Sequence, residues 1–224
     1  MAPFRISGGL ILAAVYLQVA SGWPLTHLVY GGWEPLPLWP LIPLLVLTAL
    51  LFRAGDFARD VPAAAVTLVG TLYLGGLGGC IAALRVMRPV ERGPWRIVLL
   101  LAIVMAADTA AYFVGRALGR HKLAPTISPG KTIEGAVGGL AGGVIGAWAV
   151  SAAGLDLPGT HVVALGVLVT LAAIAGDLVE SLLKRWAGVK DSGRLFPGHG
   201  GMLDRLDSLL FGAAVLYYYF SLFG

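Results

Sequence analysis

The chain has 224 residues, of which 58% are hydrophobic and only 12% are charged. Soluble globular domains carry about 25% charged residues, so this composition excludes an ordinary soluble domain and indicates a lipid-embedded protein. The formal net charge of +4 is too small to indicate a nucleic-acid partner. The single cysteine, Cys80, excludes an internal disulfide and a cysteine-based zinc site.

Seven apolar runs predict transmembrane helices, each of which needs roughly 20 residues to cross the hydrocarbon core. In chain order the runs cover residues 8–23, 36–52, 62–84, 97–115, 132–153, 162–183 and 206–223. The first two are the shortest, and a signal peptide is the alternative interpretation of the first. We therefore expect an all-α integral membrane protein with about seven transmembrane helices and cytoplasmic catalytic loops. Residues 1–96 would form N-terminal helices, and residues 97–224 a catalytic region.

The distribution of lysine and arginine predicts the orientation of these helices. If the runs alternate in direction, one membrane face receives twelve of the 16 cations, whereas the other receives Arg85, Arg88, Arg92 and Arg96. Because cytoplasmic loops carry the excess of Lys and Arg, the face with twelve cations is predicted to be cytoplasmic. The N-terminus then lies inside and the C-terminus outside. The polar segments that follow the fourth and sixth runs share the cytoplasmic face.

Glycines follow two lines along the fifth run, with Gly135, Gly139 and Gly143 on one line and Gly138, Gly142 and Gly146 on the other. A four-residue spacing keeps each set on one helix face, where a neighbouring helix can approach closely. We interpret both lines as packing surfaces, used within one subunit or between the subunits of a homodimer. A phosphate-binding glycine loop is the less favoured alternative, since these glycines lie inside an apolar run.

The first polar segment covers residues 108–134 and begins inside the fourth run. Asp108, Tyr112 and Arg116 are four residues apart, so they share one helix face. An ionisable residue in a membrane span is costly and indicates a functional site. The alternative is an Asp108–Arg116 ion pair that only holds helices together.

The same segment contains Ser128-Pro129-Gly130-Lys131-Thr132 directly before the fifth run. We predict that Ser128 caps a helix that has Pro129 at its first position. A helix start offers free backbone N–H groups to a phosphate, and Lys131 adds a positive charge. A simple helix cap without phosphate binding is the alternative.

The second polar segment covers residues 176–208. Asp177, Ser181 and Arg185 follow one another at intervals of four residues at the end of the sixth run. Glu180 and Lys184 are also four residues apart. An ordinary ion pair along the helix is the alternative to a functional role for these two residues. A glycine-rich stretch follows, in which the main chain can approach a ligand closely.

Two carboxylates close the second segment at the start of the seventh run. Asp204 and Asp207 are three residues apart and therefore face the same side of a helix. Oxygen ligands of this kind suit Mg²⁺ that also binds substrate phosphates, whereas helix capping is the alternative. Lysine, arginine, aspartate and glycine together are typical of phosphoryl or nucleotidyl transfer. Neither a P-loop nor a dinucleotide-binding fingerprint is present in the sequence.

The order of residues in both segments is more specific than their composition. The second segment contains Ser181, Lys184 and Arg185, then Lys190, Asp191, Ser192 and Gly193, then Pro197, Gly198, His199, Gly200 and Gly201, then Asp204, Arg205, Leu206 and Asp207. This order closely resembles the signature of the phosphatidate cytidylyltransferase family, also called CDP-diacylglycerol synthases. The first segment is similar to the same family at Asp108, Tyr112, Gly115, Arg116, Lys131 and Glu134. The first hundred residues match only as apolar runs and look shorter than in longer family members.

The resemblance implies an activity, a cofactor and a location. Members of the family transfer CMP from CTP to phosphatidate and release pyrophosphate, without a covalent enzyme intermediate. The resemblance further implies Mg²⁺ or another divalent cation as cofactor and CTP and phosphatidate as substrates. It also implies a bacterial inner membrane as the location, with the active site facing the cytoplasm.

Site residues follow from the resemblance as hypotheses. The metal ligands would be Asp177, Asp204 and Asp207. The catalytic residues would be Lys184, Arg185, Lys190, Asp191, His199 and Arg205. The substrate-binding residues would be Asp108, Tyr112, Arg116, Ser128, Lys131, Thr132, Ser181, Gly200 and Gly201.

Three other functions are compatible with parts of the pattern. A related membrane nucleotidyltransferase or polyprenol kinase would use the same phosphate-binding chemistry on another lipid. An ion-coupled transporter would explain Asp108 and Asp177 as an ion pathway, but it would not explain a lysine- and glycine-rich loop that ends in two aspartates. A structural homologue without activity is not favoured, because no charged position of the signature is lost.

Overall fold

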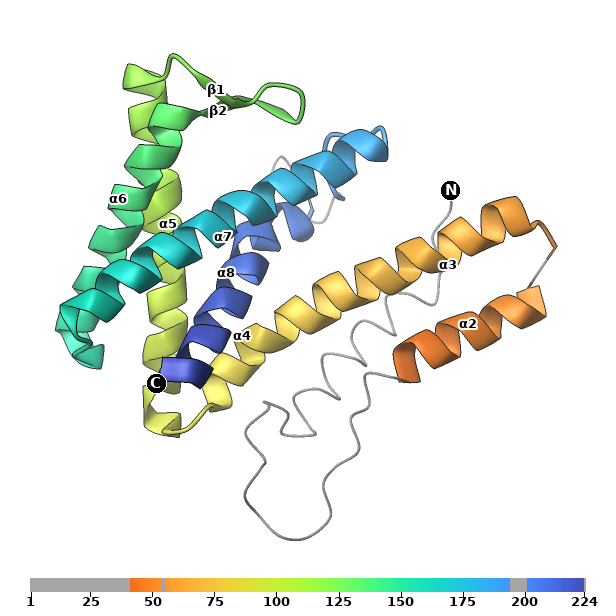
Figure 1. Cartoon of the computed structure of the whole chain (residues 1–224), viewed down its shortest axis with the longest axis horizontal. Helices are drawn as coiled ribbons and strands as arrows, with labels where there is room; N and C mark the ends of the chain where they lie inside the picture. Colours follow the sequence, from red (N-terminus) through yellow and green to blue (C-terminus); the bar gives the residue numbers. More distant parts are fainter. Residues whose placement is uncertain (1–40, 54, 194–200, 224) are drawn as a thin grey trace, which may run out of the picture. The chain divides into compact units, whose positions relative to one another are not determined.

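The structure, a computed structural model, describes residues 41–53, 55–193 and 201–223. The chain divides into two compact units between Ala83 and Leu84. The elements before that boundary are α2 (Leu41–Arg53), α3 (Phe57–Thr71) and the π-helical turn η1 (Leu72–Gly76), and α4 (Leu77–Val86) crosses it. The elements after it, shown in Figure 1, are η2 (Val90–Arg92), α5 (Gly93–Leu118), β1 (Lys122–Ala124), β2 (Ser128–Thr132), α6 (Ile133–Val150), η3 (Ser151–Leu155), α7 (Gly159–Trp186) and α8 (Leu203–Phe223).

Five helical segments of the described residues are long and apolar enough to cross a membrane: Phe57–Val86, Val90–Leu118, Ile133–Leu155, Gly159–Trp186 and Leu203–Phe223. They coincide with the last five of the seven predicted runs, which supports an integral membrane protein. The first predicted run lies outside the described residues. The second is described only from Leu41, where α2 has 13 residues. The count of seven therefore stays a prediction.

The described residues are mostly helical, as expected, but a short β-hairpin interrupts the helices. Strands β1 and β2 pair antiparallel, with Lys122 opposite Thr132 and Ala124 opposite Ser128. The hairpin joins the end of α5 to the start of α6 and projects from the end of these helices in Figure 1. It therefore carries the whole of the Ser128–Thr132 stretch as a strand.

The start of α6 also differs from the expectation. Ser128 and Pro129 lie in β2, and the helix begins at Ile133, four residues after the predicted first position. Thr132 is the N-cap, and its Oγ1 accepts a hydrogen bond of 3.1 Å from Gly135 N. Strand pairing satisfies backbone groups that a helix beginning at Pro129 would have left to water. Because the cap is four residues later, Lys131 precedes α6 and belongs to the hairpin.

Fully buried aliphatic side chains hold the second unit together. Leu99, Leu100 and Ile103 of α5 are at most 1% exposed, as are Leu165 of α7 and Leu216 of α8. The outward faces of the same helices are apolar as well, which suits contact with lipid tails rather than water. Large apolar side chains exposed on these faces include Met105, Phe113, Ile145, Trp148, Leu168, Leu171 and Leu222.

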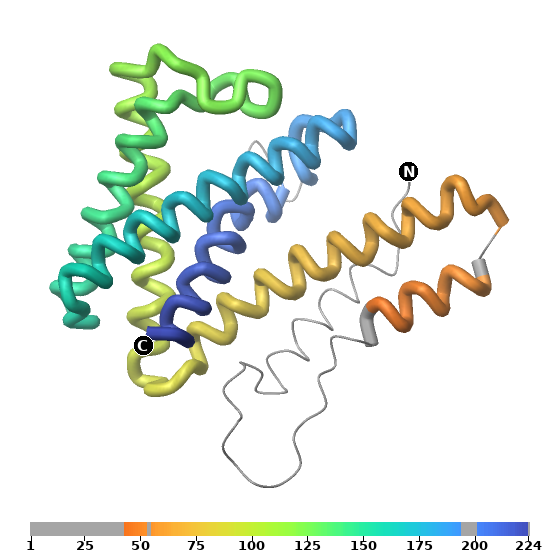
Figure 2. The backbone as a smooth tube through the Cα atoms, viewed as in Figure 1, coloured from red at the N-terminus to blue at the C-terminus, as the bar shows by residue number. Residues whose placement is uncertain are grey.

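The predicted glycine packing surfaces are confirmed. Helices α5 and α6 lie side by side in both backbone views (Figures 1 and 2), and Gly142 is at their contact. A Cβ atom added to Gly142 would lie 2.6 Å from both Ala106 O and Ala110 Cβ, so only glycine permits this approach. A Cβ on Gly143 would lie 3.0 Å from Gly166 O of α7. The two glycine lines therefore pack α6 against two neighbours within one subunit.

The direction of the four long helices brings both polar segments to one end of the second unit. The end of α5, the start of α6, the end of α7 and the start of α8 all lie at the end that carries the hairpin (Figure 1). At the opposite end, Arg96 is buried and donates hydrogen bonds to Met87 O at 2.6 Å and Arg88 O at 3.1 Å. Its guanidinium also lies 5.4 Å from the centre of the Phe220 ring. Arg96 thus caps a helix end and is not a free surface charge.

Candidate active site

An ion pair joins the two polar segments of the sequence. Lys131 Nζ of β2 pairs with Asp177 Oδ2 of α7, and both side chains are half-buried. Asp177 also accepts a hydrogen bond of 3.3 Å from Ser181 Oγ, one helical turn further along α7. A second link is made by Arg185, whose Nε donates to Ile127 O of the hairpin loop at 3.4 Å. The prediction that the two segments lie together at one face is therefore confirmed within the second unit.

A cavity of about 550 Å³ opens beside this ion pair. Its walls come from α5, the hairpin, α6 and α7. Six of the predicted site residues line it: Asp108, Tyr112, Arg116, Lys131, Thr132 and Asp177. A volume of this size is typical of small-molecule sites, and convergent charged groups on apolar walls are typical of binding pockets.

The α5 wall of the cavity carries Asp108, Tyr112 and Arg116 in line, as their spacing predicts. Arg116 Nη1 donates to Tyr112 Oη at 2.8 Å, so the alternative Asp108–Arg116 pair is not formed. Asp108 instead interacts with Asp177 and Lys131 across the cavity. Arg116 therefore presents its guanidinium to the cavity without a carboxylate partner among the described residues.

A clamp at the base of the hairpin fixes the position of Lys131. The Glu134 carboxylate, in the first turn of α6, accepts hydrogen bonds from the backbone N–H groups of Arg120 at 3.1 Å and His121 at 3.2 Å. It also lies 2.6 Å from His121 Nδ1. The two residues before β1 are thus bound to the first turn of α6. This clamp leaves little freedom to β2, which carries Lys131.

Asp204 is the centre of a second group of polar contacts, at the end of α7 and the start of α8. Its Oδ1 accepts a hydrogen bond of 2.8 Å from Lys184 Nζ. Its Oδ2 accepts from Ser192 Oγ at 2.8 Å and from Gly201 N at 2.6 Å. Gly201 is required here because a Cβ would lie 2.6 Å from Gly193 N. Asp204 therefore binds both described ends of the glycine-rich stretch to α8.

Carboxylates of three helices gather around the Lys131 ammonium. Asp108 of α5 and Asp207 of α8 each lie close enough to Asp177 for electrostatic repulsion, and Lys131 attracts both. Asp207 is buried, and the close approach of α8 at this point depends on Gly176, whose Cβ would lie 2.5 Å from Asp207 O. Among the residues that the structure describes, no three side chains of the metal-binding types are close enough to hold an ion by themselves.

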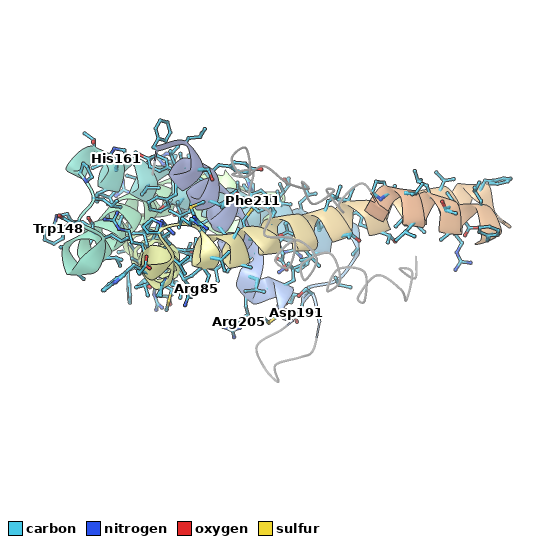
Figure 3. All side chains as sticks on the ribbon, turned by 90° about the horizontal axis from the view of Figure 1, so that it is seen from below. Arg85, Trp148, His161, Asp191, Arg205 and Phe211 are labelled. Atoms are coloured by element: carbon cyan, nitrogen blue, oxygen red, sulfur yellow. The ribbon has the colours of Figure 1, made fainter. Side chains whose placement is uncertain are left out.

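Several predicted site residues lie apart from these contacts. Lys190, Asp191 and Arg205 are exposed, and their side chains make no hydrogen bond or ion pair with other described residues. In Figure 3, Asp191 and Arg205 lie well away from Trp148 and His161. Ser128 lies in β2 outside the cavity lining. His199 and Gly200 fall outside the described residues.

The hairpin and two further contacts were not predicted from the sequence. The clamp by Glu134 and the role of Ser192 as a donor to Asp204 were not predicted. A signal for the hairpin was present, because Pro125 and the Pro129-Gly130 pair are typical turn residues in a short polar stretch. The burial of Glu180 could not be predicted in this way, because the sequence of an i,i+4 pair is the same whether the pair lies on a buried or an exposed helix face.

Comparison with known proteins shows which family this chain is similar to. A model described as the cytidylyltransferase family matches residues 8–223 of the chain. A phosphatidate cytidylyltransferase from Brucella suis is 46% identical over 174 residues, which make up 78% of this chain and 62% of that protein. Enzymes with the same name from Synechocystis sp. and Bacillus subtilis are 47% and 44% identical over 126 and 122 residues. Those regions make up 42% and 45% of the two proteins, so the chain spans less than two thirds of the length of these relatives.

Proposed function

Because this chain belongs to the cytidylyltransferase family, we propose that it transfers CMP from CTP to phosphatidate, forming CDP-diacylglycerol and releasing pyrophosphate. The main support is one cavity at the end of apolar helices, lined by six residues drawn from both polar segments. Such a position suits a reaction between one soluble and one lipid substrate. The names of the relatives from three bacteria support the same reaction.

The proposed reaction needs positioning and positive charge more than acid–base chemistry. A phosphate oxygen of phosphatidate forms a bond to the α-phosphorus of CTP, while the bond from that phosphorus to the bridging oxygen of the β-phosphate breaks. The attacking oxygen is already anionic, so a strong general base is unnecessary. Charge that develops on the phosphates is stabilised by fixed cations in a water-poor site. Arg116 and Lys131, which line the cavity, would supply this charge.

The lipid substrate has a natural approach to this cavity. Phe113 of α5 and Val137 of α6 are 64% and 61% exposed on the two helices that form its walls. Exposed apolar side chains of this kind favour contact with acyl chains. We assign the phosphate of phosphatidate to the Arg116 side of the cavity, with its acyl chains along the outer faces of α5 and α6. CTP would then reach the site from the aqueous side, near Lys184 and the glycine-rich stretch.

A divalent cation, expected to be Mg²⁺, fits the donor chemistry of the site. Asp177 lines the cavity, and Asp207 lies close enough to Asp177 for electrostatic repulsion, which a cation between them would relieve. Asp204 Oδ1 accepts hydrogen bonds from Lys184 Nζ at 2.8 Å and from Ser192 N at 3.3 Å, so a cation would share this oxygen with them or displace them. Mg²⁺ usually binds one or two carboxylates together with waters and substrate phosphates. When bound, it would neutralise the triphosphate charge. Asp177, Asp204 and Asp207 remain the proposed ligands.

We also propose a location and an orientation. The cations of the second unit are concentrated at the end that carries the hairpin, including Arg116, Arg120, Lys122, Lys131 and Arg185. The positive-inside rule then directs this end to the cytoplasm, where CTP is available. The bacterial relatives support the inner membrane as the location.

An assay with purified protein tests the proposed function. Labelled CTP, phosphatidate and Mg²⁺ should yield CDP-diacylglycerol, and Asp204→Asn should lower the rate by about 100-fold or more while the protein remains folded. Asp156→Asn is the matched control, because Asp156 follows η3 at the opposite end and has φ 48°, a conformation that asparagine also tolerates. Transfer of the γ-phosphate in place of CMP would instead identify a lipid kinase. No lipid-linked product under any divalent metal would refute the proposal.

A further inference from the structure

Glu180 is a deeply buried acidic residue that has no role in the reaction as proposed above. Its side chain is 1% exposed, although it lies on α7, a helix apolar enough to cross a membrane. A carboxylate in such surroundings is costly unless it has a partner of opposite charge. The partner is Lys184, whose Nζ lies 2.5 Å from Glu180 Oε2. Neither Glu180 oxygen makes a well-aligned hydrogen bond to any described residue.

Lys184 lies between two carboxylates from different helices. Its Nζ is 2.5 Å from Glu180 Oε2 of α7 and 2.8 Å from Asp204 Oδ1 of α8. Asp204 in turn accepts hydrogen bonds from Ser192 Oγ and Gly201 N. A continuous chain of charged contacts therefore runs from the buried Glu180 to the described ends of the glycine-rich stretch.

This arrangement differs from an ordinary ion pair along a helix. An exposed i,i+4 pair is surrounded by water and has little effect on the position of either side chain. Glu180 is shielded from water, and Lys184 is 22% exposed. A lysine has a flexible four-carbon stem and a compact charge, so one carboxylate leaves its ammonium free to swing. A second carboxylate, from another helix, holds the ammonium in one place.

We propose that Glu180 is a positioning residue, whose buried carboxylate holds the Lys184 ammonium against Asp204 at the edge of the active site. The inference rests on the proposed function only in assigning Lys184 to a substrate phosphate. The contacts themselves predict that Lys184 becomes more mobile when the charge of Glu180 is removed. That consequence can be measured with or without catalysis.

Kinetics provide the first test. Glu180→Gln keeps the shape of the side chain and removes its charge, so kcat/KM for CMP transfer should fall by about 10–100-fold. Glu180→Asp keeps the charge on a shorter side chain and should give an intermediate value. Thr170→Val is the control, because Thr170 is a fully buried residue of the same helix whose hydroxyl has no partner among the described residues. Its kcat/KM should equal that of the unmodified protein.

Chemical reactivity provides a second test that does not depend on catalysis. Acylation of lysines by acetic anhydride is followed by mass spectrometry, with the exposed Lys122 as reference within the same chain. Glu180→Gln should raise the acylation rate of Lys184 several-fold relative to Lys122, since its ammonium has lost one of two partners. Thr170→Val should leave this ratio unchanged.

The outcomes separate this inference from the proposed function. If Glu180→Gln retains both the kcat/KM and the Lys184 acylation ratio of the unmodified protein, Glu180 is not a positioning residue. The same holds if Thr170→Val reproduces both changes. If the unmodified protein transfers no CMP, the proposed function fails, and the acylation ratio alone decides the role of Glu180. If Glu180→Gln does not fold, the Glu180→Asp variant decides the question. A kcat/KM and a Lys184 acylation ratio equal to those of the unmodified protein would then overturn the inference.

Discussion

Lys131 and Lys184 show how the same side chain serves two purposes at this site. Lys131 lines the cavity and pairs with Asp177, so its charge faces the space where a ligand would bind. Lys184 lies outside the cavity lining and bridges Glu180 and Asp204. A lysine ammonium is a compact charge on a flexible stem, so its neighbours decide which role it takes. Both lysines were predicted as site residues, whereas this difference between them was not.

Substitution of Lys131 tests whether its charge acts on substrate. Lys131→Met should lower CMP transfer by about 100-fold or more, because it removes a fixed cation from the place where phosphate charge develops. The measurement is the transfer assay at equal amounts of folded protein. Lys122→Met is the control, since Lys122 is an exposed residue of the partner strand and does not line the cavity. Equal activity in the two variants would contradict the assignment of Lys131 to the site.

The hairpin is the element that the site depends on most directly. Its two strands place Lys131 against α7, and the Glu134 clamp holds the base of the hairpin to α6. A loop without these contacts would have to order Lys131 at each turnover, at an entropic cost. The pentapeptide Ser128–Thr132 pairs as a strand, so Pro129 does not begin a helix.

The contact between α5 and α6 is the second element on which the site depends. Gly142 lies against Ala106 and Ala110, and this close contact sets the spacing of the helices that form two cavity walls. Gly142→Ala should lower the free energy of unfolding by about 1–3 kcal/mol, because the added Cβ overlaps with backbone and side-chain atoms that cannot easily move. The measurement is SDS-induced unfolding of the purified protein in mixed micelles.

Gly159→Ala is the matched control for this substitution. Gly159 begins α7, and a Cβ added there meets no atom within 4 Å, so the free energy of unfolding should change by no more than about 0.5 kcal/mol. Because alanine is intrinsically more favourable than glycine in a helix, an equal loss of stability in both variants would contradict helix packing as the cause.

At the scale of the whole molecule, the helix directions of the second unit predict which loops share a membrane face. Three long helices, α5, α6 and α7, separate η2 from the segment after α7, so these two regions lie on opposite sides. Of the four cations on the side of η2, Arg96 is buried in hydrogen bonds to backbone carbonyls. Lys131 and Lys184 on the other face are paired as well, so the count of twelve cations against four remains the basis of the proposed orientation.

Cysteine labelling in intact cells tests this orientation. On a Cys80→Ala background, Glu91→Cys should react with an impermeant maleimide, whereas Val189→Cys should react only after the membrane is permeabilised. Both residues are exposed. Gly93 would be unsuitable as a labelling site, because a side chain there would overlap with Arg85 O. Labelling of both positions from the same side would contradict the helix count between them.

The sequence by itself determined the membrane class, the five described spans and the family. Apolar runs of sufficient length have no other stable location than lipid, and the spacing of polar residues at their ends is specific enough to identify related proteins. The glycine packing surfaces were equally predictable, since a four-residue repeat places small residues on one face whatever the neighbour is. Asp108, Tyr112 and Arg116 were correctly placed on one face for the same reason.

Only the tertiary structure decided which of these residues meet. The Lys131–Asp177 pair, the bridge of Lys184 between Glu180 and Asp204, and the donation from Ser192 to Asp204 all join residues that are distant in sequence or on different helices. Helical periodicity shows which residues share a face, but it does not show which neighbour that face meets. The hairpin also became visible only in the tertiary structure, because short strands are stabilised by pairing with each other and not by a residue pattern within either strand.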